Sequence, residues 1–152
     1  MKVLFIGDIV GEPGRRAIEV IVPRLKHREK VDFVVANGEN IAGGSGITPK
    51  LAEELIRHGV DVITTGDHIW KRKEIVDEIE SQRRLLRPAN YPAGCPGTGS
   101  VVVTSGSGVE VGVVNLIGRV FMQAVECPFK VAKQEVERLR AKARVIIVDI
   151  HA

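Results

Sequence analysis

The sequence is poor in cysteine, in aromatic side chains and in long apolar runs. Its two cysteines, Cys95 and Cys127, lie far apart and form no C-x-x-C pair, which argues against a disulfide framework or a zinc knuckle. Reduced thiols suit a cytoplasmic protein. The apolar run 3–6 is too short for a signal peptide, and no run approaches the length of a transmembrane helix. We therefore expect a cytoplasmic protein without membrane association.

A strong charge of either sign is also missing. The formal net charge is +3, the basic residues are scattered, and aromatic residues make up 4% of the chain. These values argue against a nucleic-acid partner that stacks bases on aromatic rings. A chain of 152 residues with 44% apolar and 27% charged residues is typical of one soluble globular domain. The sequence leaves homo-oligomerisation open.

Short β-branched runs alternate with helical patterns in the first half of the chain. Strands are predicted at 2–7, 31–37 and 60–66, and helices at 14–28, 48–59 and 73–82. Pro23 should kink or break the first helix. Thr48 as the N-cap and Pro49 at the first helical position mark the second helix, which Gly59 should end. This βαβαβα order predicts a parallel, layered α/β fold.

The pattern changes in the second half. The Pro- and Gly-rich segment 85–99 predicts a loop, and 100–105 and 109–118 predict a hairpin around Gly106–Gly108. A helix at 128–142 and a buried strand at 143–152 follow. A central strand rarely ends a domain with a polar residue at its tip, so we expect a longer protein or another segment that completes the fold.

Polar side chains gather after the predicted strands. Asp8 follows the first strand, Glu39 and its neighbours the second, Asp67 and His68 the third, and His151 the last. Ligands of open α/β sheets bind beyond the carboxyl ends of the strands, so parallel neighbours would bring these loops to one edge. Carboxylates, amides and imidazoles together suit Mn, Fe or Zn better than Ca or Mg alone.

Each of these residues also has an ordinary explanation. Asp8 could cap a turn, Glu39 could be solvated in a glycine-rich loop, His68 could pack beside Trp70, and His151 could be idle at a chain end. Their shared position at the strand ends favours a site. The glycines of "GDIVGEPG" match neither the dinucleotide-binding pattern nor a P-loop, and no serine or cysteine lies in a nucleophile elbow.

These residues also lie in motifs that resemble a known family. The segments "GDIVGEPGRR", "VVANGENIAGGSGIT", "TTGDHIWK", "RPANYP", "GRVFM" and "VDIHA" are similar, in this order, to the YmdB-like family of calcineurin-type metallophosphoesterases. The resemblance runs over the whole chain. It implies a four-layer α/β/β/α fold, a β-sandwich flanked by helices, in one domain at 1–152 that is incomplete at its C-terminus. It also implies two divalent metal ions, iron or manganese, and hydrolysis of small phosphodiesters such as 2′,3′-cyclic nucleotides.

The resemblance assigns roles by motif. It implies five metal ligands: Asp8, Glu39, Asn40, Asp67 and His151. Glu39 would bridge the ions, with Asp8 and Asn40 on the first ion and Asp67 and His151 on the second. His68 would donate a proton to the leaving alkoxide. Two metal ions that act together need a shared anionic ligand, and a carboxylate with two oxygens can provide it.

Two departures separate this chain from the family pattern. Asp67 stands where the family has asparagine, which keeps an oxygen ligand and adds a negative charge. The family also continues into a later histidine-rich segment that supplies one further imidazole to each metal, and this chain has no histidine after His151. A non-catalytic fragment or regulatory binding module that keeps the fold is therefore the alternative function.

Substrate-binding residues are less clearly marked. Asn90 or Tyr91 in "RPANYP" could contact substrate, or this stiff loop could only shape the edge of the site. Arg119 follows a predicted strand and could meet a phosphate or form a surface salt bridge.

Overall fold

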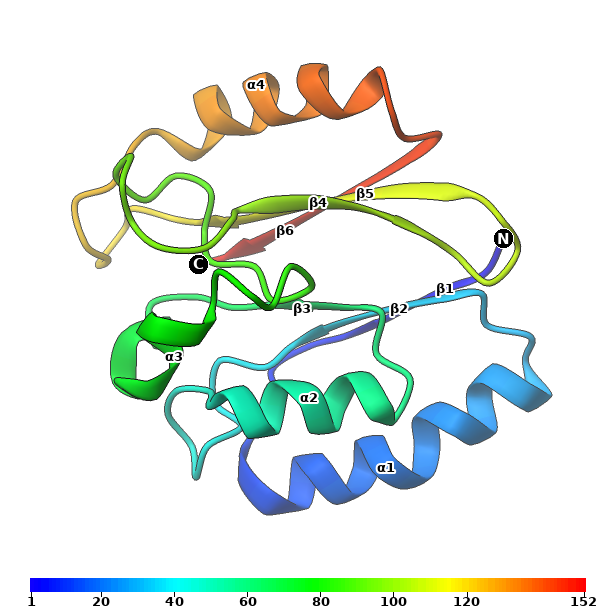
Figure 1. Ribbon diagram of the computed structural model, residues 1–152. Helices are drawn as coiled ribbons and strands as arrows, with labels where there is room; N and C mark the ends of the chain where they lie inside the picture. Colours follow the sequence, from blue (N-terminus) through cyan, green and yellow to red (C-terminus); the bar gives the residue numbers. More distant parts are fainter.

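Two three-stranded sheets and four α-helices make up the fold in a computed structural model of residues 1–152 (Figure 1). The first sheet is parallel, in the order β1 (Val3–Ile6), β2 (Phe33–Asn37), β3 (Val62–Thr64). The second has the order β4 (Ser100–Thr104), β5 (Glu110–Ile117), β6 (Val145–His151). Its first pair is antiparallel, and β5 and β6 are parallel.

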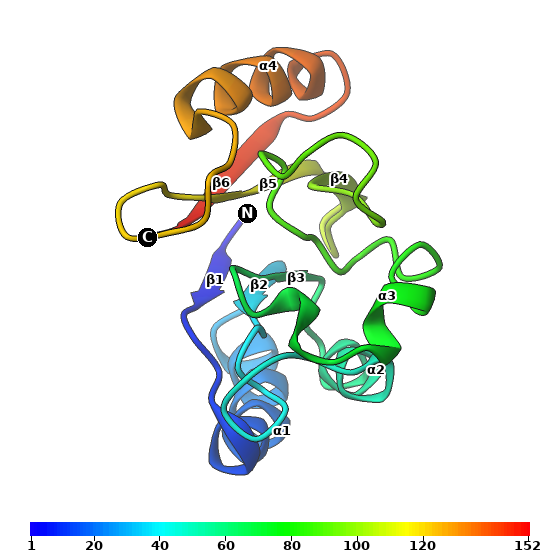
Figure 2. The ribbon, with the colours of Figure 1, turned by 90° about the vertical axis from the view of Figure 1, so that its left-hand side faces the viewer.

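The helices cover the outer faces of the two sheets. Helices α1 (Gly11–Arg28) and α2 (Pro49–Arg57) lie against the first sheet, and α4 (Pro128–Arg140) lies against the second. A 3₁₀-helix, η1 (Ile69–Lys71), and the short α3 (Glu74–Glu78) follow β3. Seen from the end where the C-terminus lies, the sheets are stacked between α4 on one side and α1 on the other (Figure 2).

The space between the sheets is apolar at one end. Phe33, Val35 and Val62 of the first sheet pack there against Val111 and Val113 of β5. Side chains alternate along a strand, so the next inward-facing positions follow at steps of two. At the other end of the same strands these positions are polar: Asn37, Thr64, Asn115 and Asp149. The inward face therefore changes from apolar to polar toward the loops that follow β1, β2 and β3.

Helix α2 follows the sequence prediction closely. It begins at Pro49, and the Thr48 hydroxyl accepts a hydrogen bond from the Leu51 N–H at 3.4 Å. The predicted hairpin at 100–118 is also confirmed, because β4 and β5 pair antiparallel around Gly106–Gly108. No helix of the chain has both the length and the apolar character that a membrane crossing needs.

Three features differ from the sequence predictions. Helix α1 begins at Gly11 and runs through Pro23 without a break. Pro23 is exposed, so water can satisfy the carbonyl that its missing N–H would have bonded. Helix α3 is only five residues long, and η1 was not expected. The strand that carries His151 pairs with β5 in the second sheet, so it is not a neighbour of β1–β3.

Candidate metal centre

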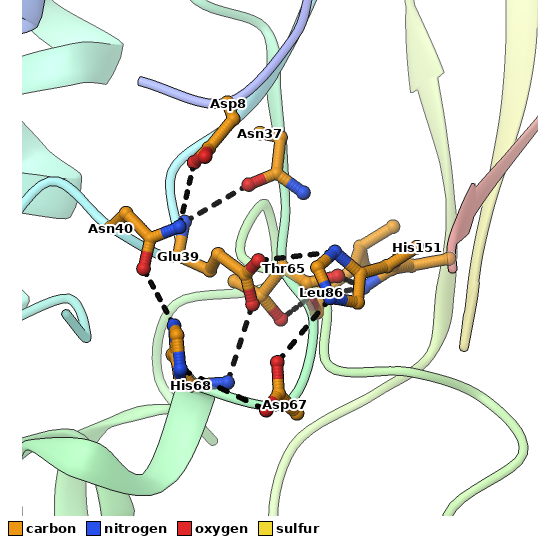
Figure 3. A network of polar contacts seen from close by, with 10 residues as sticks. Asp8, Asn37, Glu39, Asn40, Thr65, Asp67, His68, Leu86 and His151 are labelled. Carbon is orange, nitrogen blue, oxygen red and sulfur yellow. Dashed lines mark hydrogen bonds and ion pairs between the residues drawn. The ribbon is translucent and has the colours of Figure 1, made fainter. Parts of the chain in front are cut away.

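Glu39 lies at the centre of a polar network between the two sheets (Figure 3). The residue is 1% exposed and stands in the turn that follows β2. Its backbone N–H donates to the Asn37 side-chain oxygen at 3.2 Å, which fixes the start of the turn. Its carboxylate Oε2 accepts the backbone N–H of His68 at 3.2 Å. The turn after β2 is therefore bonded to the turn after β3.

His151 and Asp67 approach Glu39 from two different sheets. The His151 Nδ1 atom lies 3.0 Å from Glu39 Oε1, and its Nε2 atom lies 3.3 Å from Asp67 Oδ1. Ligand atoms of these three residues all lie within 4.8 Å of one another. Two carboxylates and one imidazole at this separation suit a transition-metal ion. The sequence predicted that these residues would meet at one edge of a single sheet. That prediction is wrong for His151, because the cluster is formed by residues from two sheets.

Asn40 connects two further predicted residues. Its Nδ2 donates to Asp8 Oδ1 at 2.8 Å, and its Oδ1 lies 2.6 Å from His68 Nδ1. An amide oxygen can only accept, so the proton of this contact belongs to His68 Nδ1. The neutral imidazole then has its lone pair on Nε2, which lies 3.8 Å from Asp67 Oδ2. Asp8 is exposed and stands outside the three-residue cluster.

Gly66 allows the cluster to close. A Cβ atom at this position would lie 2.5 Å from the His151 Cγ and closer still to Glu39 Oε2. Any side chain here would therefore displace the carboxylate or the imidazole. Gly66 was not identified from the sequence, although its place between a strand and Asp67 in "TTGDH" is the signal that could have identified it.

Burial controls the electrostatics of the cluster. Removal of the Glu39 carboxyl from water raises its pKa, although the charges of His151 act in the opposite direction. Tyr91 is 6% exposed, and burial together with the charges of Asp67 and Glu39 raises its pKa to about 12. The Tyr91 hydroxyl has no hydrogen-bond partner in the chain. It lies close enough to the carboxylates to respond to their charge.

The other two substrate candidates lie differently. Asn90 is fully buried, and its Nδ2 donates to the carbonyls of Ile117 and Glu126 at 2.8 and 3.0 Å. Its Oδ1 accepts the Ile117 N–H at 2.9 Å, so the amide braces the segment after β5. This arrangement favours a structural role for "RPANYP". Arg119 is exposed on that segment and makes no hydrogen bond or ion pair within the chain.

Comparison with known proteins gives matches along almost the entire chain. The model of the "YmdB-like protein" family matches residues 4–152. The chain is 43% identical, over all of its 152 residues, to a Bacillus subtilis protein named 2′,3′-cyclic-nucleotide 2′-phosphodiesterase. The match covers 57% of that relative, so the chain spans a little over half of its length.

Solved structures agree with the fold. A crystal structure of a Thermus thermophilus protein described as hypothetical superposes with a TM-score of 0.89 at 39% identity, and the match covers 100% of this chain and 58% of that one. A Mycoplasma pneumoniae protein described as a novel phosphatase superposes with a TM-score of 0.88 at 31% identity, covering 100% of this chain and 55% of that one.

Proposed function

Because the chain belongs to the YmdB-like protein family, we propose that it forms the metal-binding part of a metal-dependent phosphodiesterase. The proposed substrates are small phosphodiesters such as 2′,3′-cyclic nucleotides, and the proposed cofactors are two divalent ions, iron or manganese. The observation that carries the proposal is the buried Glu39 carboxylate, which has Asp67 and His151 on one side and the Asn40–Asp8 pair on the other.

The residues present fit one ion well. Burial disfavours a charged Glu39 carboxyl, and a bound cation would compensate that charge. Glu39, Asp67 and His151 would hold this ion, because their ligand atoms already lie within 4.8 Å of one another.

The ion assigned to Asp8 and Asn40 would have fewer free ligands from this chain. Asp8 and Glu39 would hold it, and Asn40 has its Nδ2 turned to Asp8 and its Oδ1 turned to His68. Asn40 would join this ion only after its amide released His68. The site formed by Glu39, Asp67 and His151 should therefore bind its ion the more tightly of the two.

Two divalent ions, when bound, supply Lewis-acid polarisation of the phosphoryl group and a lowered pKa for an attacking water molecule. The chain's own residues would hold and orient the reacting groups. Glu39 and His151 enter from opposite sheets, and in this proposal the substrate would bind at the end of the space between the sheets where they meet.

His68 is the proposed proton donor. Asn40 Oδ1 accepts the proton on its Nδ1, which orients the ring. The donor would be the doubly protonated ring, which gives the proton on Nε2 to the leaving group and becomes the neutral imidazole with its remaining proton on Nδ1. Asp8 in turn accepts from Asn40 Nδ2 at 2.8 Å and so fixes the amide orientation. Asp8 and Asn40 would therefore orient His68 as long as the Asn40 amide keeps its bond to the ring.

We also propose that the two sheets and their covering helices form the four-layer α/β/β/α domain that the motifs imply. In this proposal residues 1–152 contribute one such domain. The stacked order of α4, the two sheets, and α1 with α2 supports it.

Metal loading and hydrolysis test the proposal together. We expect the full-length protein to bind Mn²⁺ or Fe²⁺ and to hydrolyse bis(p-nitrophenyl) phosphate. The substitution Glu39→Gln removes the shared carboxylate while keeping the side-chain shape, so turnover should fall by roughly 10²-fold or more. Metal content by elemental analysis should fall with it.

Glu19→Gln is the matched control, because Glu19 is exposed on α1 and forms no ion pair. The Bacillus subtilis relative serves as the positive control for the assay. Wild-type turnover in Glu39→Gln at normal metal content would show that Glu39 does not bridge metal ions.

A regulatory binding module is the second candidate function, because only three residues of this chain form the compact cluster. Metal analysis separates the two candidate functions. About two metal ions per chain would support the enzyme, whereas the absence of bound metal after loading with Mn²⁺ and Fe²⁺ would support the module and contradict the enzyme.

A further inference from the structure

Behind the metal cluster, the inward-facing residues of three strands form a small polar group. Thr64 belongs to β3, Asn115 to β5 and Asp149 to β6. Asn115 and Asp149 are direct neighbours in the register of β5 and β6. Thr64 and Asn115 are fully buried. None of these three residues was identified from the sequence, although Asn115 is the single amide in the apolar run "VEVGVVNLIG".

Each of the three contributes a buried oxygen atom that has no hydrogen-bond partner in the chain. These atoms are Thr64 Oγ1, Asn115 Oδ1 and Asp149 Oδ2. The amide nitrogen of Asn115 is already bonded, because it donates to the carbonyls of Thr65 at 2.9 Å and Leu86 at 3.0 Å. These bonds turn Oδ1 away from both carbonyls. Unsatisfied buried oxygens are costly, so native structures rarely leave three of them together.

The backbone brings the three residues to the same level of the space between the sheets. Asn115 is the register partner of Asp149, and its amide nitrogen donates to the carbonyl of Thr65, the residue that follows Thr64. Neither Thr64 Oγ1 nor Asp149 Oδ2 has a hydrogen-bond partner in the chain. Asn115 Oδ1 can only accept a hydrogen bond, and so can Asp149 Oδ2 in the ionised carboxylate. Thr64 Oγ1 belongs to a hydroxyl, which can donate.

We propose that Thr64, Asn115 and Asp149 enclose one ordered water molecule, and that Asp149 acts through it as a positioning residue for His151. The water donates its two hydrogens to Asp149 Oδ2 and Asn115 Oδ1 and accepts the Thr64 hydroxyl proton. All three oxygens then have a partner, and three hydrogen bonds are the usual number for a buried water. This water joins β3 to β5 and β6 across the space between the sheets.

The position of this group relates it to the metal cluster. Asp149 precedes His151 by two residues on the same face of β6, and Thr64 precedes Gly66 and Asp67 at the end of β3. The water would thus fix the separation of the two strands whose ends carry His151 and Asp67. The inference uses the proposed function only for the role of those two residues as ligands.

Two substitutions of Thr64 separate the hydroxyl from the methyl group. Thr64→Val keeps the shape and removes the hydroxyl, whereas Thr64→Ser keeps the hydroxyl and removes the methyl. We expect Thr64→Val to lower Mn²⁺ affinity, titrated by electron paramagnetic resonance, by roughly tenfold, since lost support of a metal ligand has effects of this size. Thr64→Ser should keep an affinity close to that of the wild type.

Thr104→Val is the control, because Thr104 is an exposed threonine on β4 that bonds only Glu110. A high-resolution crystal structure of the metal-free chain should show a water within hydrogen-bond distance of all three oxygens, and that of Thr64→Val should lack it. The His151 imidazole should also change its nitrogen chemical shifts in Thr64→Val.

Two results would overturn the inference. The first is a structure in which the three side chains bond one another directly with no water between them. The second is the reverse order of affinities, with Thr64→Val unchanged and Thr64→Ser weakened, because packing of the methyl group would then be the role of Thr64. These measurements need no turnover, so failure of the proposed phosphodiesterase activity leaves them interpretable.

Discussion

At the scale of single residues, the geometry of the cluster depends on His68, His151 and Gly66, which surround the Glu39 carboxylate. Glu39 is held by the backbone of His68 and by the ring of His151. Both contacts depend on the absence of a side chain at Gly66. The strand-end positions of Glu39, Asp67 and His151 could be predicted, since polar residues after buried strands leave a clear pattern. The need for Gly66 could not, because it arises from a contact between two sheets.

Gly66→Ala should therefore damage the cluster. The added Cβ would overlap the Glu39 carboxylate and the His151 ring, so one of them must move. We expect metal affinity to fall by roughly tenfold or more, with a loss of about 1–3 kcal/mol in the free energy of unfolding from overpacking. Calorimetric metal titration and urea unfolding measure the two effects.

Gly106→Ala is the matched control for this substitution. A Cβ at Gly106 comes no closer than 3.6 Å to the Asp32 carbonyl oxygen, and its backbone does not require glycine. The control should keep wild-type metal affinity. Equal metal affinity in Gly66→Ala and the wild type would show that the cluster tolerates a shift of Glu39 or His151.

At the scale of elements, the glycine-rich loop 42–46 is tied to the segment that follows β3. Gly43, Gly44 and Gly46 all have positive φ angles, of 71°, 97° and 84°, which other residues adopt only with strain. The Arg72 guanidinium donates to the carbonyl oxygens of Ala42 at 2.5 Å and Ser45 at 3.1 Å. The loop after Glu39 is thereby bonded to the segment that begins with Asp67.

Loss of these bonds in Arg72→Ala should free the loop. Two hydrogen bonds from an exposed cation contribute modestly, so we expect amide hydrogen exchange at 42–46 to quicken by about tenfold. Exchange in β2 should not change. Arg72→Lys should give an intermediate rate, because lysine has a single nitrogen in place of the two that bond Ala42 and Ser45. Arg83→Ala, at an exposed arginine without bonds within the chain, is the control. Unchanged exchange in Arg72→Ala would mean that the glycine backbone alone holds the loop.

The elements themselves were predictable to different degrees. Thr48 and Pro49 mark the start of α2 because capping and the proline ring act locally. The predicted break at Pro23 was wrong, because the effect of a proline depends on which side of α1 faces solvent. The pairing of β6 with β5 was not predictable from the strand order. Partner choice depends on packing between Val111 and Val145 and their neighbours, which only the folded chain brings together.

At the scale of the whole molecule, the cluster lies where the two sheets meet, so its ionisation should affect global stability. Burial raises the pKa of Glu39 above its ordinary value of 4.5. The folded state therefore holds this proton more tightly than the unfolded state does. The resulting stabilisation is complete below pH 4.5 and is lost as the pH rises through the raised pKa of Glu39.

The Glu39→Gln variant has no ionisable group at this position, so its stability does not decrease for this reason as the pH rises. In the presence of chelator it should therefore be more stable than the wild type at neutral pH, and the difference should shrink as the pH falls toward and below 4.5. Asp149 has a raised pKa in both proteins, so its contribution cancels in the difference. Urea unfolding followed by circular dichroism at a series of pH values measures the two curves.

Bound metal should make the wild type more stable than Glu39→Gln at neutral pH. A ligand that binds only the folded state at 100 times its dissociation constant stabilises by about 2.7 kcal/mol, which for a chain of this size raises Tm by roughly 5–10 °C. Mn²⁺ should give the wild type this increase, whereas Glu39→Gln and His151→Ala should show little. His27→Ala, at the far end of α1, should respond as the wild type does. If Mn²⁺ raised the Tm of Glu39→Gln as much as that of the wild type, the stabilising ion would be bound elsewhere.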